Sequence, residues 1–114
     1  MDFKKRAPAV EKLIKEIDPY KDFRVKVTGY VVELISETNS FLLSDPTGKI
    51  NVLLEDEHLL HNLKVGDFVS VIGTILNLEG DFEIKLEIIQ NFNKINKELF
   101  YKVHEYVKKV NEYV

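Results

Sequence analysis

The chain has 114 residues, a length that fits one domain with one hydrophobic core. There is no cysteine, which excludes a disulfide scaffold, a thiolate zinc site and a cysteine nucleophile. No apolar run approaches the roughly 20 residues that span a bilayer, and no apolar signal core follows the first six residues, so we expect a soluble, cytoplasmic protein.

Charge is distributed unevenly along the chain. Residues 1–22 carry six basic and five acidic side chains, residues 93–114 five basic and three acidic ones, and residues 23–92 five basic and eleven acidic ones, a net charge of −6. Phosphate neutralisation by Lys and Arg supplies most of the affinity of a non-specific nucleic-acid binder. The acidic central segment therefore predicts weak independent binding of nucleic acid.

Residues 8–17 predict a short N-terminal helix. Pro8 suits the first helical turn, and four apolar residues recur at helical spacing, namely Val10, Leu13, Ile14 and Ile17. Pro19 ends the helix, because the residue before a proline is pushed out of the α region.

Alternation of apolar and polar residues then predicts five strands, at about 24–35, 40–44, 50–54, 68–78 and 82–89. Gly29 and Gly73 lie inside the first and fourth strands, where a glycine suggests a bend or bulge. The polar segments 36–39, 45–48 and 79–81 are typical of turns. Between the third and fourth strands, acidic residues followed by an apolar side of Leu59, Leu60 and Leu63 indicate a short helix.

Three strands, a short helix and two strands is the order of the OB-fold, a five-stranded barrel that binds oligonucleotides or oligosaccharides. An SH3-like barrel is the main competitor, but it usually lacks the helix after the third strand. We therefore expect a mainly β protein with one domain over residues 1–114: an N-terminal arm and helix (1–20), a barrel (23–92) and an oligomerisation helix (94–114).

The long amphipathic C-terminal helix predicted over residues 95–114 is the sharpest local pattern. At about 100° per residue, its apolar side chains fall within one arc of about 140°, namely Ile95, Leu99, Phe100, Val103, Tyr106, Val107, Val110, Tyr113 and Val114. The arc is wider than a two-stranded coiled-coil seam. The helix would be about 30 Å long, more than a small barrel covers, so we expect another chain on part of it. Packing only on its own barrel is the simpler alternative.

Nearly the whole chain resembles the smallest subunit of the archaeal replication protein A heterotrimer. The resemblance starts at Lys5-Arg6-Ala7-Pro8-Ala9-Val10 and is carried by residues 24–31 (RVKVTGYV), 43–48 (LSDPTG), 65–73 (VGDFVSVIG) and 87–92 (EIIQNF), the last leading into the helix. Many OB-folds share such strand–turn–glycine patterns. The helix directly after the fifth strand makes the resemblance more specific.

The resemblance implies a non-catalytic role in coating single-stranded DNA during DNA replication, repair and recombination, in the nucleoid. It also implies that larger OB-fold subunits join this one through a bundle of C-terminal helices. The interface residues would be Leu99, Phe100, Val103, Tyr106, Val107 and Val110.

The sequence departs from the DNA-contacting members of this family at two positions. Base-stacking aromatics are expected near the end of the third strand and in the last hairpin, where this chain has Glu55 and Leu78. The remaining candidates for the nucleic-acid face are Lys26, Tyr30, Lys49, Asn51 and Lys85. We therefore expect weak DNA contact, with an RNA-binding OB-fold and a protein-interaction barrel without nucleic-acid binding as alternatives.

Other constellations give little sign of chemistry. His58 and His61 are spaced like two metal ligands on a helix, but no third ligand is evident, so we expect no metal. Asp81, Glu83 and Glu87 fit a solvated strand face better than an acid/base set. No phosphate loop, catalytic motif or cofactor motif occurs, so we expect no enzyme and no cofactor. The basic cluster at residues 4–6 is either a solvated terminus or an arm that touches DNA or a partner.

Overall fold

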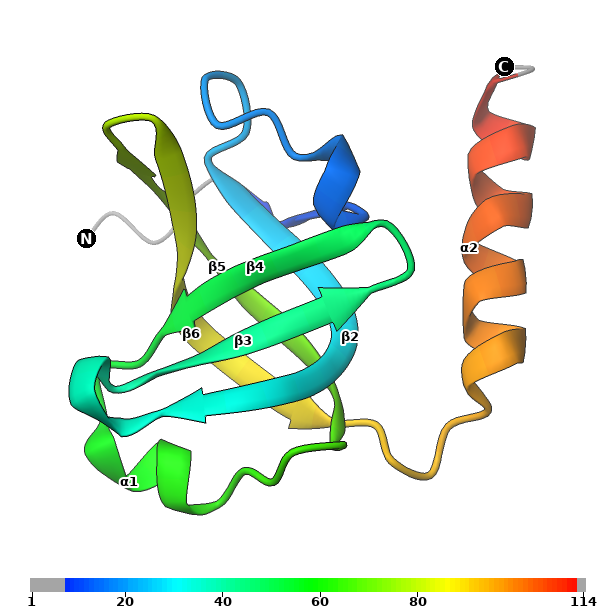
Figure 1. Cartoon of the computed structure of the whole chain (residues 1–114). Coiled ribbons are helices and arrows are strands. Elements are labelled where there is room, and N and C mark those ends of the chain that lie inside the picture. The colour runs from blue at the N-terminus through cyan, green and yellow to red at the C-terminus, as the bar shows by residue number, and fades with distance from the viewer. Residues whose placement is uncertain (1–7, 113–114) are drawn as a thin grey trace.

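A computed structural model describes residues 8–112, including side chains up to Glu105 except that of His104. Its centre is a closed barrel of five strands: β2 (Arg24–Ile35), β3 (Ser40–Asp45), β4 (Gly48–Leu53), β5 (Phe68–Leu78) and β6 (Asp81–Asn91). The strand order is β2-β3-β4-β6-β5, and β5 pairs again with β2, which closes the sheet (Figure 1). The predicted OB-type barrel is confirmed.

Strand β2 closes the sheet because it bends and pairs with two different strands. The N-terminal half of β2 pairs with β5 and its C-terminal half with β3, and the β2–β3 register shifts between Val31 and Glu33. The second register shift falls at Gly73, where β5 pairs with β6. At Gly29 there is no bulge, but a Cβ there would collide with the Ser44 carbonyl oxygen. The two glycines thus serve the bend and the close strand approach that a barrel needs.

The core fills the barrel with alternate residues of all five strands, the fully buried ones including Val25, Val71, Phe41, Leu43 and Ile84. The short helix α1 (Glu57–His61) lies at one end of the barrel (Figure 1). Its Leu59 and Leu60, and the following Leu63, pack against the core. Asp56 caps this helix by accepting a hydrogen bond from the His58 amide at 2.9 Å. The predicted helix between the third and fourth strands is confirmed.

The predicted N-terminal helix is wrong. Residues 8–17 instead contain a two-residue strand, β1 (Val10–Glu11), which pairs parallel with β2, and one 3-10 turn, η2 (Ile14–Glu16). The Ile14 amide donates to Asp45 Oδ2 at 2.7 Å and the Lys15 amide to Thr47 Oγ1 at 3.0 Å. A ten-residue helix is marginal by itself, so these bonds to the β3–β4 turn decide the conformation. The apolar pattern still predicted burial, since Ile14 and Ile17 join the core.

The C-terminal helix α2 (Lys97–Glu112) is shorter than predicted. It begins two residues later than expected because Asn96 caps it, accepting a hydrogen bond from the Leu99 amide at 2.9 Å. Figure 1 shows α2 standing beside the barrel at the end of an extended connection from β6. Within residues 8–112 no helix is long and apolar enough to cross a membrane.

Candidate nucleic-acid face and partner helix

Three of the five predicted nucleic-acid residues lie on β4 and β6, on one outer face of the barrel. Pairing across the sheet puts Lys49 opposite Ser44, Asn51 opposite Leu42, and Lys85 opposite Leu53. Paired residues project from the same side of a sheet, and side chains alternate along each strand. Lys49, Asn51 and Lys85 therefore belong to one surface over β3, β4 and β6, which we call the β3–β4–β6 face.

Carboxylate side chains bind two of these three residues, Lys85 and Asn51. Lys85 Nζ lies 2.6 Å from Glu55 Oε1, an ion pair that raises the pKa of Lys85 through its hydrogen bond and its charge. Asn51 Nδ2 donates to Glu83 Oε2 at 2.7 Å. Glu55, which stands where a base-stacking aromatic was expected, thus neutralises the charge of Lys85. An incoming polyanion would have to displace these carboxylates, so the face offers little net attraction.

The other two predicted residues, Lys26 and Tyr30, lie on β2, where Tyr30 pairs with Ser44 and so projects from the same side of the sheet as Lys49. Lys26 lies in the N-terminal half of β2, where it pairs with Ile72 of β5 and not with β3. The Tyr30 ring packs on Phe68 with ring centroids 5.0 Å apart, and Lys97 Nζ lies 5.0 Å from the centroid of the Tyr30 ring. Tyr30 is therefore engaged under the first turn of α2, and its ring is not free to stack on a base.

The first turn of α2 is fixed to the barrel by an aromatic cluster. Phe68, which is fully buried, contacts Phe100 and Tyr101 edge-on with centroid separations of 6.0 Å in both cases. Phe92, from the connection to α2, packs on Phe100 at 6.4 Å. Aromatic pairs of this kind stabilise by about 0.5–1.5 kcal/mol beyond their buried area. The cluster sets where α2 leaves the barrel.

Tyr101 adds a directional bond to this anchor. Its hydroxyl donates to the Thr28 carbonyl oxygen at 3.1 Å. Burial, followed by the nearby Asp45 and Tyr30, raises the pKa of Tyr101 to about 12. The phenol is therefore protonated, and able to donate, throughout the neutral range. Sequence reasoning missed Tyr101 because it lies outside the apolar arc of the helix.

Replacing Tyr101 by phenylalanine should loosen α2 and leave the barrel intact. The change removes one hydrogen bond, worth about 1 kcal/mol, so we expect roughly fivefold faster amide exchange in the first turn of α2 with a nearly unchanged melting temperature. Because the folded pKa lies above the ordinary value of about 10, this contribution is complete below about pH 10 and disappears as the pH rises toward 12. Unchanged exchange in the variant would show that the bond does not hold the helix.

The predicted partner residues divide between two sides of α2. Phe100 turns toward the barrel, whereas Leu99 and Val103 are 58% and 51% exposed. Leu99 and Val103 are four residues apart, so they form one stripe, and Leu99 lies about 160° around the helix from Tyr101. Tyr106, Val107 and Val110 fall among the side chains that are not described. The simpler expectation, packing on the chain's own barrel, therefore holds for Phe100, and the other side of the helix is open.

Two exposed aromatics, Tyr20 and Phe23, were not predicted as candidates. They follow Pro19 in the loop before β2, and their exposed fractions are 88% and 63%.

Within residues 8–112 no group of three or more His, Cys, Asp or Glu side chains could hold a metal ion.

The barrel resembles several solved structures, whereas no protein-family model and no curated protein sequence matches the chain. The telomere capping protein Ten1 of S. pombe aligns with a TM-score of 0.67 at 16% identity, covering 90% of this chain and 99% of Ten1. A chain of the S. pombe Stn1–Ten1 complex aligns with a TM-score of 0.62 at 14% identity, covering 79% of this chain and 74% of that one.

Asparaginyl-tRNA synthetase from Pyrococcus horikoshii aligns with a TM-score of 0.62 at 19% identity over 71% of this chain. This chain spans only 22% of the synthetase. At such identities the likenesses show the fold alone. The chain is an OB-fold barrel. The solved structures that it resembles include the telomere capping protein Ten1 and one part of a tRNA synthetase.

Proposed function

We propose that this OB-fold barrel is a non-catalytic subunit of a single-stranded DNA-binding complex of the replication protein A kind. In this proposal α2 joins the chain to larger OB-fold subunits, and the barrel adds weak, salt-sensitive contact with DNA. The proposal includes a cytoplasmic, nucleoid-associated role in DNA replication, repair and recombination. The likeness to Ten1, a protein also solved in complex with Stn1, supports an OB-fold chain that works with a partner.

The exposed stripe on α2 is the observation that carries the proposal. Leu99 and Val103 are each more than half exposed on a helix that the aromatic cluster fixes to the barrel by its first turn. A row of exposed apolar side chains on a protruding helix is typical of helix–helix association. A second helix that covers the row removes its apolar surface from water, which is favourable. The anchor keeps the stripe directed away from the barrel, where another subunit could reach it.

The neutralised β3–β4–β6 face supports a subunit whose contact with DNA is secondary. Its Lys85 ammonium pairs with Glu55, and its Asn51 amide is bound to Glu83. The same observation favours the second candidate, a protein-interaction barrel without nucleic-acid binding. An RNA-binding barrel has less support, because it would more often present a basic face.

Co-purification from the native host tests the assembly role, and the expected result is a larger OB-fold subunit that accompanies this chain. Titration of a fluorescent thymine oligonucleotide tests the DNA role, with binding expected at about 50 mM salt and weakening as salt rises. A chain that purifies with a partner but binds no oligonucleotide, alone or with that partner, would leave the protein-interaction barrel.

Removing the charge of Glu55 should strengthen DNA binding. Glu55→Gln frees the ammonium of Lys85 for one phosphate contact, so we expect roughly fivefold tighter binding at about 50 mM salt and a salt slope steeper by about 0.7. The oligonucleotide titration, repeated at several salt concentrations, measures both quantities. Glu98→Gln on α2 makes the same change in net charge away from this face. An equal gain in both variants would show that only net charge matters and that Lys85 makes no contact.

A further inference from the structure

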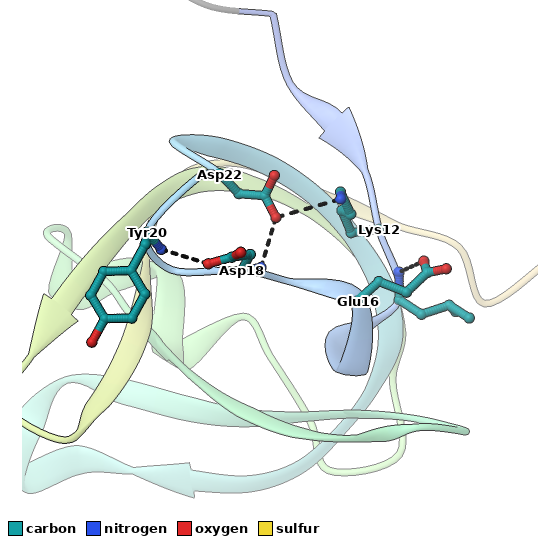
Figure 2. Close-up of polar contacts among 6 residues, drawn as sticks. Lys12, Glu16, Asp18, Tyr20 and Asp22 are labelled. Atoms are coloured by element: carbon teal, nitrogen blue, oxygen red, sulfur yellow. Dashed lines mark hydrogen bonds and ion pairs between the residues drawn. The ribbon is translucent and has the colours of Figure 1, made fainter.

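The loop at residues 18–22 before β2 has a fixed shape in which its carboxylates bond to the chain itself. Asp22 Oδ2 accepts the Asp18 amide at 2.8 Å, and Asp18 Oδ1 accepts the Tyr20 amide at 2.9 Å (Figure 2). Lys12 Nζ also lies 3.5 Å from Asp22 Oδ2. One turn earlier, Glu16 Oε1 accepts the Leu13 amide at 2.8 Å. The acidic groups of this segment are therefore already occupied by donors.

What the loop offers to solvent is an exposed tyrosine followed in the chain by an exposed lysine. Tyr20 is 88% exposed, and its ring extends away from Lys12 and Asp22 (Figure 2). Lys21, the next residue, is also exposed, and Phe23 is 63% exposed. Tyrosine has a large flat ring that can stack on a ligand, and Tyr20 buries almost none of its surface in this chain. An exposed ring on a hydrogen-bonded loop, with an exposed lysine at the next position, matches the two parts of a nucleotide, a base that stacks and a phosphate that pairs.

The position of this loop continues the surface on which the fold binds its ligands. Asn77 Nδ2, near the tip of the β5–β6 hairpin, donates to the Pro19 carbonyl oxygen at 3.1 Å. The Ile75 amide donates to the Phe23 carbonyl oxygen at 2.9 Å. In OB-folds this hairpin borders the oligonucleotide path. A strand that leaves the β3–β4–β6 face across the hairpin therefore meets Tyr20 next.

We propose that Tyr20 and Lys21 form a nucleotide-stacking site, in which the Tyr20 ring stacks on one base of single-stranded DNA and the Lys21 ammonium contacts the neighbouring phosphate. This inference rests on the proposed function. It places the stacking contribution on the loop before β2, because Glu55 and Leu78 stand where aromatics were expected. Protein docking fits the site less well, because lysine is depleted at the core of protein–protein interfaces.

Titration of a thymine oligonucleotide at about 50 mM salt tests the site, using the full chain together with any subunit that co-purifies with it. Alanine substitution of a stacking aromatic costs about 1–3 kcal/mol per base, so we expect Tyr20→Ala to weaken binding at least fivefold. Tyr20→Phe keeps the ring and should bind like the unmodified chain. Lys21→Gln should lower the salt slope by about 0.7. Val65→Ala, at an exposed apolar position before β5, is the matched control and should change nothing.

Three outcomes would overturn the inference, and they differ in what they say about the proposed function. If the unmodified chain binds and Tyr20→Ala binds equally well, the stacking site is wrong and the DNA-binding function stands. If the unmodified protein binds no oligonucleotide, both fail. If Tyr20→Ala leaves DNA binding intact but releases a co-purifying subunit, the loop is a protein contact. Photocrosslinking of an iodouracil oligonucleotide to Tyr20, lost in Tyr20→Ala, would support the site directly.

Discussion

Replacing Leu99 and Val103 together by aspartate should release the chain from its partner subunits and leave the barrel folded. Both side chains are more than half exposed on α2, so the substitutions disturb no core contact. Burial of each by a partner helix would contribute about 1.5–3 kcal/mol, and a buried unpaired carboxylate costs more. We expect association to weaken at least about 100-fold. The mass of the complex in solution and the yield of co-purified partner measure the effect.

Lys102→Asp is the matched control for this double substitution. Lys102 is exposed on the same helix, and its replacement introduces a carboxylate outside the Leu99–Val103 stripe. Association should persist in the control, and the circular dichroism of all three proteins should be alike. If the double variant assembles as well as the unmodified chain, α2 is not the contact that joins the subunits.

Asp45→Ala should be strongly destabilising, because one carboxylate holds the N-terminal segment and the β3–β4 turn together. Asp45 is 8% exposed. Its Oδ1 accepts the amides of Thr47 and Gly48 and the Thr47 hydroxyl, and its Oδ2 accepts the Ile14 amide. Alanine leaves these donors without a partner, and hydrogen bonds to a charged group contribute about 1.5–3 kcal/mol each. We expect a loss of about 3–5 kcal/mol, or a melting temperature lower by about 12–20 °C.

Two further variants serve as comparisons for Asp45→Ala. Asp45→Asn keeps one acceptor oxygen and should fall between alanine and the unmodified chain. Asp56→Ala removes a carboxylate with one helix-capping bond at an exposed site, so it should cost only about 1 kcal/mol. Thermal unfolding measures all three. If Asp45→Ala costs no more than Asp56→Ala, the four bonds of Asp45 together stabilise the fold no more than the single helix cap does.

The barrel could be predicted from the sequence because its pattern is local and repeated. Alternating residues in five segments, such as Val25 and Val27 or Ile84 and Leu86, have no other way to bury one face each. The turn at residues 45–48 and the glycines at 29 and 73 agree with that pattern. Each of these signals lies within a few residues of the structure that it predicts, so no distant contact had to be known.

The candidate site was predicted only in part, because its chemistry depends on pairs far apart in the sequence. Lys85 and Asn51 were placed on the expected face, but their partners Glu55 and Glu83 are about thirty residues away, a distance that strand pairing alone closes. Tyr30 was assigned to the open face, whereas Phe68 and Lys97 cover it. A pattern along one strand cannot show what another element lays over it.

The sequence by itself determined the closed barrel, the short helix between β4 and β5, and an amphipathic helix after the last strand. These follow from the periodicity of apolar residues, which is a property of each segment. Only the tertiary structure decided that residues 8–17 are not a helix, that carboxylates neutralise the β3–β4–β6 face, and that α2 is fixed by Phe100 and Tyr101. Each of these outcomes depends on hydrogen bonds or ring contacts between distant residues, whose energies exceed the weak local preference of the chain.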